Sequence, residues 1–234
     1  MLPKIQMNMK LLSFIFLSFI SICCNAKGIK CIYVTQHVIP EKIYMLENKF
    51  VREKVIADLK EDKKFYSLTC ANGKYLFERL PGGVDKVPLS PDQTSVFINF
   101  TDSSKIVQQQ YAGQYYILNT KAESYSWNIT NETKRMSGWH CIKAELKNDP
   151  KIIAWFTLDI PFSFGPWGYY GLPGLIVQMQ TPVYILYLNE VSSTDGIELN
   201  PPSTGEAISQ KDFDKLVGKS DKERFKSADK VTYH

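Results

Sequence analysis

The stretch that decides how this chain folds is Gly165-Pro166-Trp167-Gly168-Tyr169-Tyr170-Gly171-Leu172-Pro173-Gly174-Leu175-Ile176. It holds four glycines, two prolines and three aromatic residues. Neither a regular helix nor a central strand accepts that composition, because proline lacks an N–H and glycine carries a large entropy loss on ordering. Leu172-Pro173-Gly174-Leu175 predicts a type II turn, and a strand follows at once. No nucleophile, general base or metal ligand is present, so the stretch indicates architecture or an apolar surface.

The same stretch resembles the defining motif of the GLPGLI family, a group of exported bacterial proteins. Residues 171–176 spell that motif, and the similarity is specific over about residues 125–180. Upstream segments follow the family's order and spacing: Trp127-Asn128-Ile129, Lys134, Gly138 to Ala144, Ala154 to Thr157, and Ile160-Pro161. His140 departs from the pattern. The resemblance implies an exported envelope protein, and it implies no established activity.

Residues 1–26 are expected to be a signal peptide. Lys4 and Lys10 supply a positive n-region, an apolar core runs from Leu11 to Cys24, and cleavage is expected after Ala26. A membrane anchor is the alternative, but roughly 14 apolar residues fall short of the ~20 that a spanning helix needs. A lipoprotein acylated at Cys23 or Cys24 is a second alternative. We therefore expect a periplasmic or outer-membrane-associated protein with no transmembrane span in the mature chain.

The composition narrows the class further. The formal net charge is +4, and removing the leader leaves 26 basic and 24 acidic residues, scattered along the chain. That balance argues against a nucleic-acid partner. The chain predicts one domain over residues 27–218, followed by a charged, frayed tail over 219–234. Nothing in it indicates a cofactor.

The fold class predicted is mainly β. Short apolar segments separated by Gly, Pro, Asn, Asp and Ser clusters indicate an antiparallel meander, and Asn72-Gly73 indicates a hairpin turn. The expected strands are Ile29–Val38, Lys64–Thr69, Lys74–Arg79, Ser95–Phe100, Ile106–Gln110, Gln114–Leu118, Ser124–Thr130, Trp139–Leu146, Lys151–Leu158, Leu175–Met179 and Val183–Leu188. They predict a curved, half-barrel-like sheet with one or two packed helices.

Two segments bear on those helices. Residues 41–62 carry apolar residues near helical spacing and are either a surface helix or a long hairpin. Ser209 with Asp212 resembles a capping pair and predicts a short C-terminal helix with Phe213 on its apolar face. The strand Val183–Leu188 is apolar on both faces. Its second face therefore requires a cover: a helix, a folded-over sheet or an apolar ligand.

Three cysteines remain once the leader is removed: Cys31, Cys70 and Cys141. A Cys70–Cys141 disulfide is one expectation for an oxidising compartment, and Cys31–Cys70 is its rival. Three buried thiols acting as small apolar residues are the third. Spacing alone does not choose among them.

The candidates for chemistry are weak. His140 and Cys141 offer two adjacent metal ligands, but successive strand residues point to opposite faces, and no further ligand spacing is present. Asp159 is a lone carboxylate. An unrecognised hydrolase or a metal-handling protein using His140 and Cys141 is therefore the alternative function, and no catalytic residue is assigned.

The main functional hypothesis is a non-enzymatic exported protein that binds an apolar ligand, such as a lipid or peptide, or an envelope partner beside outer-membrane uptake machinery. The aromatic residues of the motif region are core, or they shape an apolar groove. In the second interpretation, Phe164, Trp167, Tyr169 and Tyr170 lie at its mouth, and the binding surface comprises Phe164, Gly165, Pro166, Trp167, Tyr169, Tyr170, Gly171, Leu172, Pro173, Gly174, Leu175 and Ile176.

Overall fold

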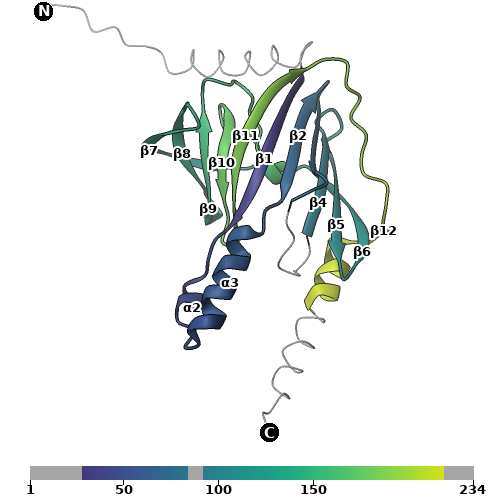
Figure 1. Ribbon diagram of the computed structural model, residues 1–234. Helices are drawn as coiled ribbons and strands as arrows, with labels where there is room; N and C mark the ends of the chain where they lie inside the picture. Colours follow the sequence, from purple (N-terminus) through teal and green to yellow (C-terminus); the bar gives the residue numbers. More distant parts are fainter. Residues whose placement is uncertain (1–27, 84–91, 219–234) are drawn as a thin grey trace, which may run out of the picture.

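The computed structural model describes residues 28–83 and 92–218. They form one 12-stranded sheet in the order β12-β6-β5-β4-β3-β2-β1-β11-β10-β9-β8-β7 (Figure 1). The strands are β1 (Gly28–His37), β2 (Phe65–Ala71), β3 (Lys74–Arg79), β4 (Asp92–Asn99), β5 (Ser104–Tyr111), β6 (Gln114–Lys121), β7 (Trp127–Met136), β8 (Trp139–Leu146), β9 (Asp149–Thr157), β10 (Leu175–Gln180), β11 (Tyr184–Thr194) and β12 (Glu206–Ala207). The predicted leader and tail lie outside the described residues.

Each strand expected from the sequence is present, and the hairpin at Asn72-Gly73 is confirmed. Both of its residues have positive φ, 51° and 71°, as the tight two-residue turn between β2 and β3 requires. Two features depart from a simple antiparallel meander. β1 lies between β2 and β11, so the first of the described strands is central, and β12 pairs with β6 in parallel.

The sheet is strongly curved, and chain connectivity shows why. β6 and β7 are ten positions apart in the strand order, which is about 48 Å across a flat sheet at ~4.8 Å a strand. Residues 122–126 alone join them, and such a link reaches at most about 21 Å. The two ends of the sheet must therefore curl toward each other, which confirms the half-barrel shape.

The curvature gives the sheet two unlike faces. The inner face carries the core, including Tyr33, Tyr75, Phe77, Phe156 and Leu186, all nearly or wholly inaccessible to solvent. Register places Ile185 and Tyr187 of β11 on the outer face, where both are half-buried. The second face of this apolar strand is thus covered only in part.

Residues 41–62 are helical rather than a hairpin. They form α2 (Glu41–Tyr44) and α3 (Lys49–Glu61), which begins at Asn48, whose side chain accepts from Val51 N. Neither helix buries a residue, and the pair projects beyond the lower end of β1 (Figure 1). Among the described residues, no helix is long and apolar enough to span a membrane.

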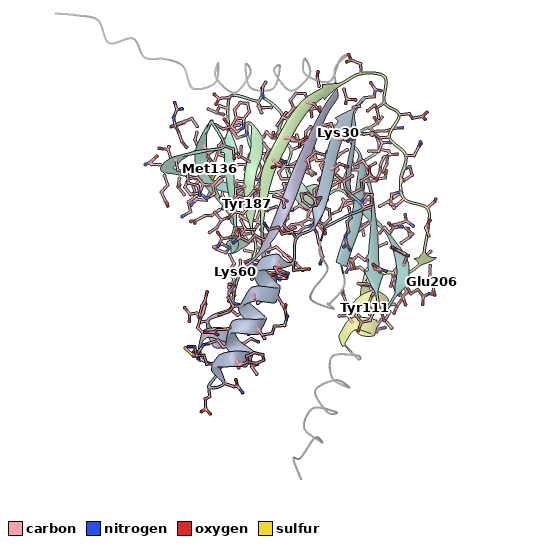
Figure 2. The ribbon with its side chains drawn as sticks, in the orientation of Figure 1. Lys30, Lys60, Tyr111, Met136, Tyr187 and Glu206 are labelled. Atoms are coloured by element: carbon pink, nitrogen blue, oxygen red, sulfur yellow. The ribbon has the colours of Figure 1, made fainter. Side chains whose placement is uncertain are left out.

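The short C-terminal helix is confirmed over residues 210–218. Ser209 Oγ accepts from Asp212 N at 3.1 Å and donates to the Asp212 carboxylate at 2.7 Å, as a capping pair does. Phe213 is 3% exposed and packs edge-on against Tyr111 and Tyr116. Figure 2 shows Tyr111 at the end of β5, beside this helix.

Candidate functional site

The glycine-rich motif lies in a loop, residues 158–174, that packs on the inner face of the sheet. Tyr75 anchors it: the hydroxyl donates to Gly165 O at 2.7 Å and accepts from Gly168 N at 2.8 Å. Tyr33 donates to Ile176 O at 2.6 Å. Burial raises the pKa of both phenols well above the ordinary value, so both hydroxyls stay neutral. The loop is thereby fixed to the centre of the sheet.

Two glycines of the motif are required because neighbouring atoms approach their backbone closely, and other glycines are required for backbone turns. A Cβ on Gly174 would lie 1.8 Å from the carbonyl oxygen of Thr157, and one on Gly165 would lie 2.4 Å from the Ile176 side chain. Gly174 does not have the positive φ of a type II turn, so that prediction is wrong. Positive φ instead occurs at Trp167, Gly168 and Gly171, at 55°, 79° and 96°.

The aromatic rings of the motif are half-buried and pack against other rings. Phe164 lies against Tyr75 and Phe100, and Trp167 lies edge-on to Phe77. Further ring contacts join Trp167 to Tyr184, Tyr169 to Tyr125 and Trp127, and Tyr170 to Phe100 and Tyr125. Since Tyr125 belongs to the link between β6 and β7, this cluster fills the hollow of the curved sheet. A ligand contact for these rings remains a prediction.

The three cysteines that were candidates for a disulfide are not bonded to one another in the structure. Cys31, Cys70 and Cys141 are free and buried. Cys70 lies on β2 and Cys141 on β8, with four strands between them, so the two thiols of that expected disulfide are not brought together. Cys31 and Cys70 lie on adjacent strands, since Cys31 pairs with Leu68 and Ile29 with Cys70.

His140 and Cys141 point to opposite faces, as the strand geometry predicted. His140 is exposed, whereas Cys141 is fully buried. Burial raises the pKa of the Cys141 thiol, against the opposing effect of the Lys134 ammonium, and Asp159 raises it further. Within the described ranges no group of three His, Cys, Asp or Glu side chains is placed to hold a metal ion.

One buried polar group escaped the sequence analysis. His37 Nε2 lies 2.5 Å from Asp62 Oδ2, and both side chains are almost fully buried. The Tyr184 ring lies 4.5 Å from the imidazole, and Lys64 Nζ lies 5.5 Å from the centre of that ring. Asp62 is the residue after α3, so the pair joins the helix to the end of β1. Polar residues at inner positions 35 and 37 of an otherwise apolar strand were the available signal.

A second loop, residues 195–205 between β11 and β12, lies on the outer face of the sheet, and we call it the strap. The strap is held to the sheet by side chains. Lys74 Nζ donates to Leu199 O at 3.4 Å, and Gln108 Nε2 donates to Thr204 O at 2.7 Å. A Cβ on Gly205 would lie 2.8 Å from the Tyr115 backbone, so the strap meets β6 closely there. Figure 1 shows it running down the edge of the sheet.

Between these anchors the strap bridges a groove. Asn200-Pro201-Pro202-Ser203 spans it, and the two prolines have no N–H with which to join the sheet. The groove is open to solvent and has a volume of about 850 Å³, within the range of small-molecule sites. Its walls come from the end of β3, the outer faces of β4 to β6 and the strap: Leu76, Glu78, Arg79, Leu80, Pro81, Gly82, Gly83, Ser95, Gln108, Gln110, Tyr115, Asn200, Pro201, Pro202, Ser203 and Thr204.

This groove is the candidate functional site. Among the described residues, Glu78 and Arg79 are the charged ones that line it, and their charges are opposite. The amides of Gln108, Gln110 and Asn200 supply both donors and acceptors. Such a surface can bind a ligand by hydrogen bonds. No motif residue lines it, and no pattern in the sequence singled it out.

Comparison with known families gives a short match. Residues 144–178 match the model of a family described as "Protein of unknown function (Porph_ging)". The matched segment runs from β8 through the motif loop to β10, which is the part of the chain that carries the glycine-rich motif. None of the curated proteins compared with the chain matches it.

Solved structures resemble the fold. A structure of PNGF-II in space group P21 has a TM-score of 0.51 at 14% identity, and one in space group C2 has 0.52 at 13%. The similarity covers 83% of this chain in both cases, but only 34% and 33% of those chains. The chain therefore spans about a third of the length of these proteins, and the similarity concerns the fold alone.

Proposed function

We propose that this chain is an exported, non-enzymatic binding protein of the cell envelope, and that the groove beneath the strap holds its ligand. The observation that carries the proposal is the groove itself: a recess of about 850 Å³ whose lining includes several hydrogen-bonding side chains. Sites of this size and shape are the usual places for ligands. The predicted leader supports export, because it combines a positive n-region, an apolar core and small residues at the cleavage site.

The burial of Cys141, the candidate nucleophile, supports a non-enzymatic role. The thiolate is the reactive form of cysteine, and burial raises the pKa of the Cys141 thiol. The His37–Asp62 pair is equally enclosed, with side chains 4% and 0% exposed. A general base needs to reach the proton that it abstracts, and this pair is shielded from any substrate in solution.

The test is native mass spectrometry of the protein purified from its own envelope. The expected result is a bound non-protein mass that is lost in Tyr115→Ala and Gln110→Ala, which strip two side chains from the groove. The matched controls are Tyr44→Ala, on the exposed surface of α2, and Gln36→Ala, on the exposed outer side of β1. A ligand-free wild type, or a bound mass that the groove variants retain, would refute the proposal.

A second candidate, an envelope partner protein, is favoured by the exposed apolar side chains of the α2 and α3 region. Met45 and Phe50 are 76% and 78% exposed, and Tyr44 and Val51 are 56% and 45% exposed. Large apolar side chains rarely gather on a surface that stays in water. Phe50→Glu is expected to abolish co-purification of one defined envelope protein while the groove-bound mass is kept. An unchanged set of co-purified proteins would refute this candidate.

A further inference from the structure

The groove floor presents polar side chains in register. Glu78 of β3 pairs with Ser95 of β4, and Ser95 pairs with Gln108 of β5. Directly paired residues of antiparallel strands point to the same face. At ~4.8 Å between strands, these three side chains form a row about 10 Å long. The row crosses the strands, so a ligand that follows it lies across the sheet.

An aromatic ring stands beside this row. Tyr115 is 38% exposed and pairs with Gln110 across β5 and β6. The face of an aromatic ring carries partial negative charge and attracts weakly positive C–H groups. Tyr115 thus offers an apolar platform next to an amide, at the place where the strap approaches β6 most closely.

The charge of the groove selects against ions. Glu78 and Arg79 carry opposite charges, and the other described side chains that line the groove are neutral. The described lining therefore has no net charge to pair with an ionic ligand, and burying an unpaired charge is costly. A fully apolar ligand would strip water from Glu78, Ser95 and the amides without replacing their hydrogen bonds, which is also unfavourable.

The position of the groove argues against an extended peptide. Peptides that join sheets do so at an exposed edge, where unpaired N–H and C=O groups bind their backbone. The floor of this groove is the middle of the sheet, where β3, β4 and β5 pair with neighbours on both sides. On this floor only side chains remain to contact a ligand, so the ligand must be rich in groups that pair with amides and hydroxyls.

We infer that the ligand is a neutral oligosaccharide, whose hydroxyls pair with the Glu78–Ser95–Gln108 row while one sugar ring stacks on Tyr115. The inference rests on the proposed function, since it names the ligand class of the same groove. Sugars combine dense hydroxyl donors and acceptors with one apolar ring face. The groove offers both kinds of surface side by side.

Isothermal titration calorimetry of the full chain tests this with four probes: cellohexaose, chitohexaose, mannohexaose and maltohexaose, each to millimolar concentration. At least one is expected to bind. Tyr115→Ala and Gln110→Ala should each weaken its binding by about five- to tenfold, the effect of losing one well-placed contact. Tyr44→Ala and Gln36→Ala should leave it unchanged. The thermal midpoints of all four variants establish that the fold is kept.

Failure of all four hexaoses to bind would overturn the inference, as would binding that Tyr115→Ala does not weaken. Binding of an uncharged Ser/Asn hexapeptide in place of the sugars would assign the groove to peptides and overturn it equally. In these cases a groove-dependent bound mass from the envelope still upholds the proposed function. If that mass is absent as well, the proposed function fails on its own.

Discussion

Removing one hydroxyl group, in Tyr75→Phe, is the sharpest test of how the motif is held. The Tyr75 hydroxyl comes from β3 and bonds to two points of the motif loop, Gly165 O and Gly168 N. Both glycines are buried. The ring itself remains in Tyr75→Phe, so packing against Phe164 is retained and only the hydrogen bonds are lost.

The expected loss of stability depends on the buried backbone groups that lose their hydrogen-bond partner. A buried donor or acceptor left without a partner costs about 1–3 kcal/mol, so the two groups together predict a loss of about 2–6 kcal/mol. Tyr33→Phe leaves one acceptor, Ile176 O, and predicts about 1–3 kcal/mol. Tyr111 is the control: its buried hydroxyl has no hydrogen-bond partner in the described part of the chain. Tyr111→Phe is therefore expected to be neutral or stabilising.

Urea unfolding followed by tryptophan fluorescence and near-ultraviolet circular dichroism measures all three variants. The slopes should match the wild type, because a constant slope means that the same surface is exposed on unfolding. The expected order of stability is Tyr111→Phe above Tyr33→Phe above Tyr75→Phe. If Tyr75→Phe and Tyr111→Phe fall within about 0.5 kcal/mol of each other, the hydroxyl does not hold the loop, and the reasoning is refuted.

Three further perturbations follow. Gly174→Ala should lower the free energy of unfolding in urea by about 3 kcal/mol or more, because the new Cβ would meet a backbone oxygen at 1.8 Å. Gly218→Ala is the control, because its Cβ meets open space and should cost nothing. Equal effects of the two substitutions would contradict the steric explanation. Asp62→Ala should cost about 3 kcal/mol by leaving His37 buried without its partner, and a thermal-unfolding loss below about 1 kcal/mol would count against that pair. Burial raises the pKa of the Cys31 thiol to about 12. Iodoacetamide at pH 8 should therefore leave Cys31 unmodified in the native protein and modify it in urea. Rapid labelling of the folded chain would instead show that the site opens.

The local elements were predictable because they depend on neighbouring residues. Asn72-Gly73 fixes its turn through the positive φ that both residues accept, and Ser209 with Asp212 fixes a helix start by short-range hydrogen bonds. Gly174 shows where such reasoning ends. Its sequence context, proline then glycine, matches a type II turn, yet the residue is required because β9 passes it closely, and that neighbour is distant in sequence.

The groove was not predictable for a similar reason. Gln108, Tyr115 and Asn200 come from three separate segments, and each looks like an ordinary solvent-facing residue in its own segment. Pairing of β5 with β6 brings Gln108 near Tyr115, and the strap then adds Asn200. The path of the strap depends on anchors such as the bond from Gln108 to Thr204 O. The His37–Asp62 pair was missed likewise, because the two residues meet only when α3 returns to the end of β1.

The two faces of the sheet place different demands on the sequence. Side chains on the concave face converge, and the motif loop fills that space with rings and close-fitting glycines, which leaves little freedom to vary. Side chains on the convex face diverge, so that face forms a recess only where the strap adds a second wall. Loops accept substitution and insertion far more readily than packed interiors do. A chain with the same motif and a different strap should therefore keep this fold and bind a different ligand, whereas a change at Gly174 acts on the fold before it acts on binding.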